Sequence, residues 1–300
     1  MQADFENESQ LKIHNYIRTR GLKIPLTGHP LIMGILNIND DSFSGDGVTD
    51  PTLALDHARK MIAQGADIVD VGAESARTNR RPISEQEEIQ RLLPFVQNFG
   101  SAMQNVGRPP LLSLNTWRPA VARAILAYGG HILNDIGALP TAENARICAE
   151  HGAALVIMHS VGEPKVSHRH MRYTNILHSL RDFFEEKIRW AEQAGMERTS
   201  IILDPGIDFA KQDHDNLRIY RELETLHTFR LPLLLPVSRK HVIGSVLNIA
   251  QPNQRDAGTV ACMVSGILRG ASIFRVHNVP AALHTIATVH RMCYSEARIK

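Results

Sequence analysis

The sequence predicts an α/β fold, a (β/α)8 TIM barrel with a short N-terminal hairpin closing the bottom. Two observations predict this fold. Eight short apolar runs, each suited to one buried strand, recur along the 300 residues, and amphipathic stretches long enough for helices separate most of them. Nearly every run also ends in a residue able to do chemistry. Active sites of such barrels lie at the carboxyl ends of the strands, which is where these residues fall.

The predicted strands each have an apolar body and stop at a polar residue or at Gly or Pro. They lie at residues 32–37, 67–74, 111–115, 131–135, 154–159, 201–204, 233–240 and 272–277. The predicted helices lie at residues 52–64, 84–96, 116–126, 141–151, 175–194, 213–227, 255–269 and 279–292.

The N-terminal 30 residues precede the first barrel strand. Residues 15–31 alternate loosely around Gly21 and a Thr-Gly-His-Pro segment, which favours a hairpin at the bottom of the barrel. The expected organisation is therefore residues 1–30 as extension and hairpin, followed by one barrel domain at residues 31–295.

Composition narrows the class of protein. The chain is 43% hydrophobic, enough for a sizeable core, and its formal charge of +2 gives no electrostatic reason to bind nucleic acid or a membrane surface. No apolar run approaches a membrane span, and the acidic N-terminus lacks the order of a signal peptide. The three cysteines are far apart and are expected to be reduced thiols. A cytoplasmic location is expected.

The residues at the predicted strand ends form a candidate site, because a barrel directs all of these ends to one mouth. They are Asn37, Glu74, Asn115, Asn134, Met158, His159, Asp204, Lys240, Arg275 and His277.

The first part of this set favours a flat polar heterocycle. Asn115 and Asn134 supply amide donors and acceptors, Asp204 supplies a buried carboxylate and Lys240 an ammonium group. A carboxylate accepts from paired N–H donors, so a ring with a guanidine-like edge fits these side chains.

The second part favours an anion, most simply a phosphate or pyrophosphate. Arg275, His277, Asn37 and Arg77 are neutral or cationic. Asn37 also supplies an oxygen for Mg²⁺, which normally keeps waters and bridges phosphate to one or two protein oxygens. The chain has no dinucleotide-binding or Walker motif and no paired Cys/His zinc spacing.

Six segments resemble dihydropteroate synthase, in that family's order and across about residues 22–292. They are residues 35–44, 70–77, 133–135, 202–207, 237–240 (Val-Ser-Arg-Lys) and 275–277 (Arg-Val-His). The resemblance implies condensation of 6-hydroxymethyl-7,8-dihydropterin diphosphate with 4-aminobenzoate, giving dihydropteroate and pyrophosphate in folate biosynthesis. It also implies a homodimer and small-molecule substrates, with no nucleic acid or membrane partner.

The resemblance assigns roles to individual residues. Lys240, Asp204 and Arg77 are the implied catalytic residues. The pterin would be held by Asn115, Asn134, Asp204, Lys240 and Met158, the diphosphate by Asn37, Arg275 and His277, and the aminobenzoate by Ser238, Arg77 and Phe209. Asn37 would also be the protein ligand of Mg²⁺.

This chain departs from the family's pattern at one residue implied to hold the pterin and at several on the acceptor side. Asn115 stands where the family has Asp, and Ala76 and Thr78 change the second loop. Asp208 and Ala210 replace residues that are usually small or uncharged on either side of Phe209, and Pro236 replaces a glycine.

These departures keep a second hypothesis open, a divergent paralogue that binds pterin but uses another acceptor or is inactive. A methyltetrahydrofolate-binding methyltransferase domain shares the barrel but needs no diphosphate site, so Arg275 and His277 argue against it. A non-enzymatic scaffold would not explain polar residues at most strand ends.

Overall fold

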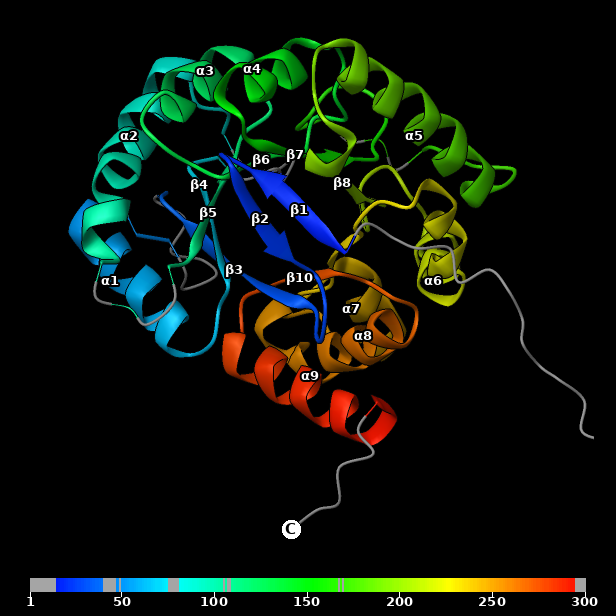
Figure 1. Ribbon diagram of the computed structural model, residues 1–300. Coiled ribbons are helices and arrows are strands. Elements are labelled where there is room, and N and C mark those ends of the chain that lie inside the picture. Colours follow the sequence, from blue (N-terminus) through cyan, green and yellow to red (C-terminus); the bar gives the residue numbers. More distant parts are fainter. Residues whose placement is uncertain are drawn as a thin grey trace, which may run out of the picture.

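The computed structural model describes residues 15–39, 47–48, 50–74, 81–104, 106, 109–166, 168 and 170–294. Eight parallel strands alternate with helices that surround them (Figure 1), which confirms the predicted barrel. The barrel strands are β3 (Leu31–Asn37), β4 (Ile68–Gly72), β5 (Leu111–Asn115), β6 (Ile132–Asp135), β7 (Ala154–Met158), β8 (Ile201–Asp204), β9 (Leu234–Pro236) and β10 (Ile273–Val276).

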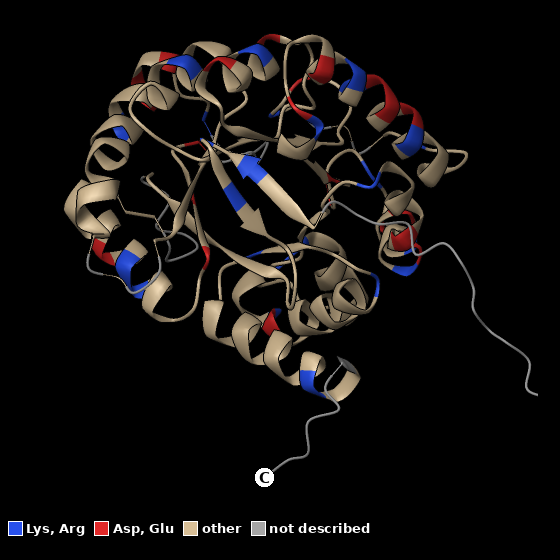
Figure 2. Ribbon diagram, viewed as in Figure 1, with Lys and Arg blue, Asp and Glu red and all other residues tan. Residues whose placement is uncertain are grey.

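The helices form the outer layer. They are α1 (Pro51–Ala63), α2 (Glu85–Ala102), α3 (Pro119–Leu126), α4 (Glu143–His151), α5 (Ile176–Gln193), α6 (Asp213–Arg221), α7 (His241–Leu247), α8 (Asp256–Leu268) and α9 (Val279–Tyr294), with 3-10 turns η2 (Arg198–Ser200), η3 (Leu223–Phe229) and η4 (Pro252–Gln254). Acidic and basic residues are interspersed along these helices, for example on α5 (Figure 2). In the described part of the chain, no helix is both long and apolar enough to cross a bilayer.

The sheet runs in the order β8-β7-β6-β5-β4-β3-β10-β9. A single parallel bridge between Leu203 and Leu233 brings β8 beside the start of β9, and the Leu203 N–H donates to the Pro232 carbonyl at 2.9 Å. The barrel is therefore nearly closed, and all of its strands end at the same mouth.

Two apolar layers stabilise the barrel. One fills its interior near the N-terminal ends of the strands, and the other lies between the strands and the helices. The interior layer contains Ile17, Leu31, Met33, Ile68, Leu111, Ile132, Ala154, Val156, Ile202, Leu234 and Ile273. Because side chains alternate along a strand, the next inward positions toward the mouth carry the polar residues.

The N-terminal hairpin, β1 (Tyr16–Thr19) and β2 (Leu22–Pro25), lies across the bottom of the barrel, in front of the strands in Figure 1. Ile17 is 1% exposed and packs on the interior layer. The Arg20 Nε donates to the Gly130 carbonyl at 2.6 Å, which fastens the hairpin beside β6. The predicted hairpin is confirmed; the exact domain boundaries stay a prediction.

The region after β8 differs from the predicted elements. The expected helix at 213–227 divides into α6 and η3, and the expected strand at 233–240 shrinks to β9. The segment after it contains α7, which the sequence analysis missed. Pro236 cannot donate to a strand ladder, and Lys240 is an extended N-cap, so the strand stops early and a short helix begins.

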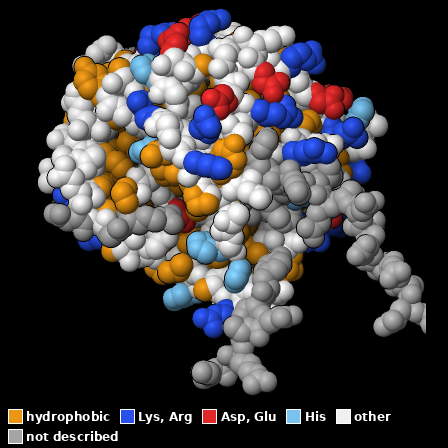
Figure 3. Space-filling model, viewed as in Figure 1, with side chains coloured by type: hydrophobic (Ala, Val, Ile, Leu, Met, Phe, Trp, Pro, Cys, Tyr) orange, Lys and Arg blue, Asp and Glu red, His pale blue; other side chains and the backbone are white. Residues whose placement is uncertain are grey.

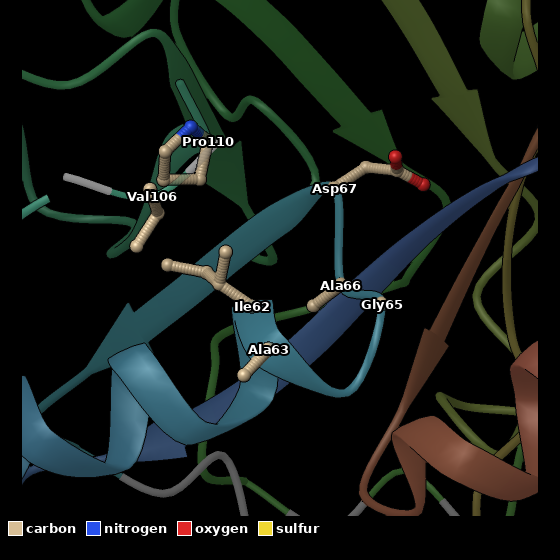
Figure 4. Close-up of a pocket in the computed structure, with 7 residues that line it drawn as sticks. All are labelled: Ile62, Ala63, Gly65, Ala66, Asp67, Val106 and Pro110. Carbon is tan, nitrogen blue, oxygen red and sulfur yellow. The ribbon is translucent and has the colours of Figure 1, made fainter. Parts of the chain in front are cut away.

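A cavity of about 390 Å³ lies at the bottom of the barrel, at the opposite end from the polar strand ends. It is lined by Ile62, Ala63, Gly65, Ala66, Asp67, Val106 and Pro110 (Figure 4). Its lining is mostly apolar, and Figure 3 shows hydrophobic side chains gathered on this face of the molecule. Asp67 uses a carboxylate oxygen to accept from the Ile32 N–H at 2.8 Å, so its carboxylate has a structural partner.

Candidate active site

The polar strand-end residues lie on the inner face of the barrel because they share the parity of the interior apolar residues. Ser113 and Asn115 follow Leu111 at two-residue steps on β5, and Asp70 follows Ile68 on β4. The register places Asp70 beside Ser113 and Asn115 beside Asn134. These side chains therefore form a polar layer directly above the apolar one.

Asp70, which the sequence analysis left out of the site, is the centre of this layer. Its buried carboxylate accepts from Ser113 Oγ at 2.6 Å and from Arg275 Nε at 2.7 Å. It also accepts from Asn134 Nδ2 at 3.2 Å and from Asn115 Nδ2 at 3.3 Å. One carboxylate thus joins two residues predicted to bind the heterocycle to one predicted to bind the anion.

These bonds orient the Asn134 amide. Its nitrogen is directed at Asp70, and its oxygen is buried without a hydrogen-bond partner among the described residues. A buried acceptor without a partner costs free energy, so it marks a place where a ligand donor would bind favourably. Asn134 therefore presents an acceptor to a ligand N–H.

Asp204 is the last residue of β8, and it is 3% exposed. Burial raises the pKa of its carboxyl to about 6, opposed by the Gly206 N–H at 2.7 Å and by nearby Lys240, Lys211 and Arg275. A buried carboxylate with cations on several sides suits a ligand edge with paired N–H donors.

Gly206 is required by the turn that follows Asp204. Its φ is +68°, in the left-handed region, and an added Cβ would lie 1.9 Å from the His159 carbonyl oxygen. No other residue fits without displacing backbone, so the strand stops here for steric reasons.

Lys240 reaches the same mouth from the N-cap of α7. Its Nζ donates to the Ile207 carbonyl at 2.9 Å and lies 5.2 Å from the centre of the Phe209 ring. Burial lowers the pKa of Lys240, and the Asp208 and Asp204 carboxylates oppose that shift. Phe209, predicted on the aminobenzoate side, is therefore adjacent to the ammonium.

Lys211 is a second buried lysine that the sequence analysis did not assign. Its Nζ lies 2.8 Å from His159 Nδ1 and donates to the Gly206 and Phe209 carbonyls at 2.9 and 3.0 Å. Burial lowers the pKa of Lys211 to about 7. His159 packs edge-on against Phe183 of α5 at 4.8 Å, so it supports the loop after β8.

Ser238 and His277 are in contact. The Ser238 hydroxyl lies 2.7 Å from His277 Nδ1 and accepts from the His277 backbone N–H at 3.2 Å. Ser238, predicted to bind the aminobenzoate, is thus in hydrogen-bond contact with His277, predicted to bind the diphosphate.

The other predicted residues are placed as follows. Asn37 ends β3 half-buried, and Met158 ends β7 buried, paired in register with Asp204. Arg77 lies outside the described residues.

Glu74 belongs to an ion-pair network beside the mouth. It pairs with Arg118 at 2.5 Å and with Lys165 at 3.1 Å, and Arg118 also pairs with the buried Glu88. Burial raises the pKa of Glu88. Glu74 therefore supports the loops around the mouth, and Arg118 and Lys165 are partners that no strand-end pattern points to.

The fold and the polar layer define a barrel of the enzyme type, with buried carboxylate, amide and guanidinium groups gathered at one mouth. The family model described as "Pterin binding enzyme" matches residues 33–277. Dihydropteroate synthase of Bacillus subtilis is 38% identical over 265 residues, covering 88% of each chain, and that of Escherichia coli is 37% identical, covering 87% of this chain and 91% of its own. The structure of Xanthomonas albilineans dihydropteroate synthase with 4-aminobenzoic acid superposes with a TM-score of 0.83 at 30% identity, covering 93% of this chain and 99% of its own.

The chain belongs to the pterin-binding enzymes, and within them to the dihydropteroate synthase family. The resemblance found in the six sequence segments is confirmed.

We expect Asp70→Asn to lower turnover at least about tenfold without unfolding the protein. The new amide would turn a donor toward Arg275, Asn115 or Asn134, and an unsatisfied buried donor costs about 1–3 kcal/mol. Asp67→Asn is the matched control, because it removes another carboxylate next to β4 at the opposite end of the barrel. Thermal midpoints show whether each variant is folded. Equal loss of turnover in both variants would contradict the placement of Asp70 at the centre of the active site.

We expect pterin affinity to fall as the pH decreases through about 6, by up to about tenfold per pH unit. The physical reason is that only the ionised Asp204 accepts from two N–H donors, and burial raises its pKa to about 6. Isothermal titration calorimetry between pH 4.5 and 8 tests this expectation. Asp204→Asn should bind weakly at every pH and lose the dependence; an unchanged slope in this variant would exclude Asp204 as its source.

Proposed function

We propose that this protein condenses 6-hydroxymethyl-7,8-dihydropterin diphosphate with 4-aminobenzoate to give dihydropteroate and pyrophosphate, as a transferase of folate biosynthesis. The observation that carries the proposal is the Asp70-centred layer, which joins heterocycle-type and anion-type side chains in one mouth. Identity above 35% to dihydropteroate synthases of two bacteria supports it, and these relatives do not favour the divergent paralogue.

The heterocycle would lie against Asn115, Asn134, Asp204, Lys240 and Met158. Asp204 and the Asn134 oxygen are acceptors suited to the ring's N–H groups. Lys240 is a donor suited to a ring nitrogen or carbonyl.

The diphosphate would be held by Arg275 and His277, with Asn37 at the neighbouring strand end. Asp70 binds Arg275 through Nε, and the terminal nitrogens of the guanidinium, which have no hydrogen-bond partner among the described residues, would bind phosphate oxygens. The guanidinium is therefore fixed in position before the anion arrives.

The oxygen that Asn37 offers at the end of β3 is of a kind that Mg²⁺ binds. Asn37 offers a hard amide oxygen, and the described residues contain no cluster of three His, Cys, Asp or Glu side chains that would form a protein-only cage. A cation that takes most of its ligands from phosphate and water needs little more than one such oxygen. Bound Mg²⁺ would neutralise charge on the leaving pyrophosphate.

The reaction breaks the carbon–oxygen bond to the diphosphate and forms a carbon–nitrogen bond to the arylamine, which then loses a proton. If the pyrophosphate leaves first, positive charge develops on the pterin. The buried carboxylate of Asp204 would favour that state, and no protein nucleophile is needed.

The acceptor would lie between Phe209 and Ser238, with Arg77 from the second loop. Phe209 is half-buried beside Lys240, and the Ser238 hydroxyl meets His277. The arylamine would thereby be next to the diphosphate that it displaces.

The proposed assembly is a homodimer. Four exposed large apolar side chains, Leu217, Val246, Leu247 and Leu268, lie on the neighbouring helices α6, α7 and α8. Sedimentation equilibrium tests the proposal: Val246→Glu should yield monomer, and a wild-type monomer would exclude it.

The direct test of function is product formation by the purified protein, with both substrates and Mg²⁺ and mass-spectrometric detection of dihydropteroate. Lys240→Ala should stay folded and lose turnover. Complementation of a bacterium lacking its own dihydropteroate synthase is the cellular counterpart. A wild-type protein that binds pterin yet forms no product would contradict the proposed reaction.

We expect pyrophosphate binding to need both Mg²⁺ and Arg275. Calorimetry should show affinity at least about tenfold weaker without Mg²⁺, and weaker again in Arg275→Ala. The control is Arg123→Ala, which removes an exposed arginine on α3 and should bind as wild type does. Equal affinity under all conditions would remove Arg275 and Mg²⁺ from the anion site.

A further inference from the structure

The loop after β8 has an unusual backbone at Asp208 and Ala210. Their φ angles are +69° and +50°, in the left-handed region, as is Gly206 at +68°. Residues other than Gly are disfavoured there, Asp less than Ala. The backbone cost at Asp208 must therefore be offset by a contact elsewhere in the fold.

Asp208 makes that contact with α7. Its carboxylate accepts from the backbone N–H of His241 and, at 3.2 Å, from that of Val242. Asn216 of α6 holds the loop from the other side: its amide oxygen accepts from the Asp208 backbone N–H at 2.9 Å, and its amide nitrogen donates to the carboxylate at 3.3 Å. The carboxylate therefore joins the loop to the first turn of α7.

The same two segments meet a second time through Lys240. Its Nζ donates to the Ile207 carbonyl, one residue before Asp208, while the Asp208 carboxylate binds the N–H of His241, one residue after Lys240. Two adjacent residues of the β8 loop therefore hold Lys240. Ile207 binds its side-chain nitrogen, and Asp208 binds the peptide N–H that follows it.

We infer that Asp208 is a positioning residue, which fixes the proposed catalytic Lys240 by joining the β8 loop to α7. The inference deepens the proposed function, on which the role of Lys240 rests. Asp208 acts through Lys240 and needs no contact with substrate.

The charge of Asp208 also affects the pKa of Lys240, which a purely structural contact would not do. Among the described residues, the titratable and charged groups that act on Lys240 are the Asp204 and Asp208 carboxylates, the Arg275 guanidinium and the Lys211 amine. Asp208 is the leading influence that raises the pKa of Lys240 against burial. Loss of its charge should therefore let Lys240 release its proton at lower pH.

The experiment compares Asp208→Asn, Asp208→Gly and Ala210→Gly. Asp208→Asn keeps the size and loses the charge, whereas Asp208→Gly removes the contact and relieves the left-handed strain. Ala210→Gly is the matched control, because it relieves strain two residues away in the same loop, and the Ala210 side chain makes no hydrogen bond to α7 among the described residues. Thermal midpoints establish that each variant is folded.

Two readouts are measured on each variant. The first is kcat against pH. The second is the titration of Lys240 itself, followed by NMR of lysines labelled with ¹³C at Cε and assigned with Lys240→Arg. The NMR readout does not require turnover, so failure of the inference and failure of the proposed function are distinguishable.

Both Asp208 variants should lower kcat about tenfold or more, because small misplacements of a catalytic group have effects of this size. Both should also shift the Lys240 titration to lower pH, while Ala210→Gly leaves both readouts as in the wild type. An unshifted Lys240 titration in Asp208→Asn would overturn the inference. So would a kcat loss in Ala210→Gly equal to that in Asp208→Gly.

Discussion

The buried carboxylate of Asp70 binds side chains from β5, β6 and β10, so four strands of the barrel wall share one polar centre. Placing an ionised group inside a barrel is costly unless it is paired and hydrogen-bonded. Here the guanidinium of Arg275 supplies the opposite charge. The same bonds direct the two Asn amides and hold the guanidinium, so the element that stabilises the layer also prepares it for ligands.

The loop after β8 is also held by a buried polar side chain, here a lysine. The buried Lys211 side chain, whose pKa burial lowers to about 7, donates from Nζ to backbone carbonyls and holds a turn that contains left-handed residues. That turn carries Asp204 at one end and the carbonyl that binds Lys240 near its middle. Two buried polar side chains, Asp70 in the wall and Lys211 in the loop, thus fix the two sides of one mouth.

Much of this architecture was predictable from the sequence, because strand periodicity and the Gly/Pro stops are local signals. All eight barrel strands and the hairpin were found in this way. The short helix α7 was missed partly because the carboxylate that accepts from its first N–H groups, Asp208, is distant in sequence. Asp70 was missed because it lies within a strand, two residues before the end. The available signal was that Asp70 and Asn115 point to the same face of two paired strands. Lys211, Arg118 and Lys165 depend on three-dimensional packing that no periodicity encodes.

The proposed role of Asp70 toward the anion is to hold the Arg275 guanidinium in position. A double-mutant cycle on pyrophosphate affinity in Mg²⁺, with Asp70→Asn, Arg275→Gln and the double variant, tests it most directly. If Asp70 acts through Arg275, loss of either residue already removes most of the benefit, and the two effects should be non-additive by about 1–3 kcal/mol. Effects that add to within about 0.5 kcal/mol would show that the two residues act independently, and would exclude Asp70 as the residue that holds Arg275 for the anion.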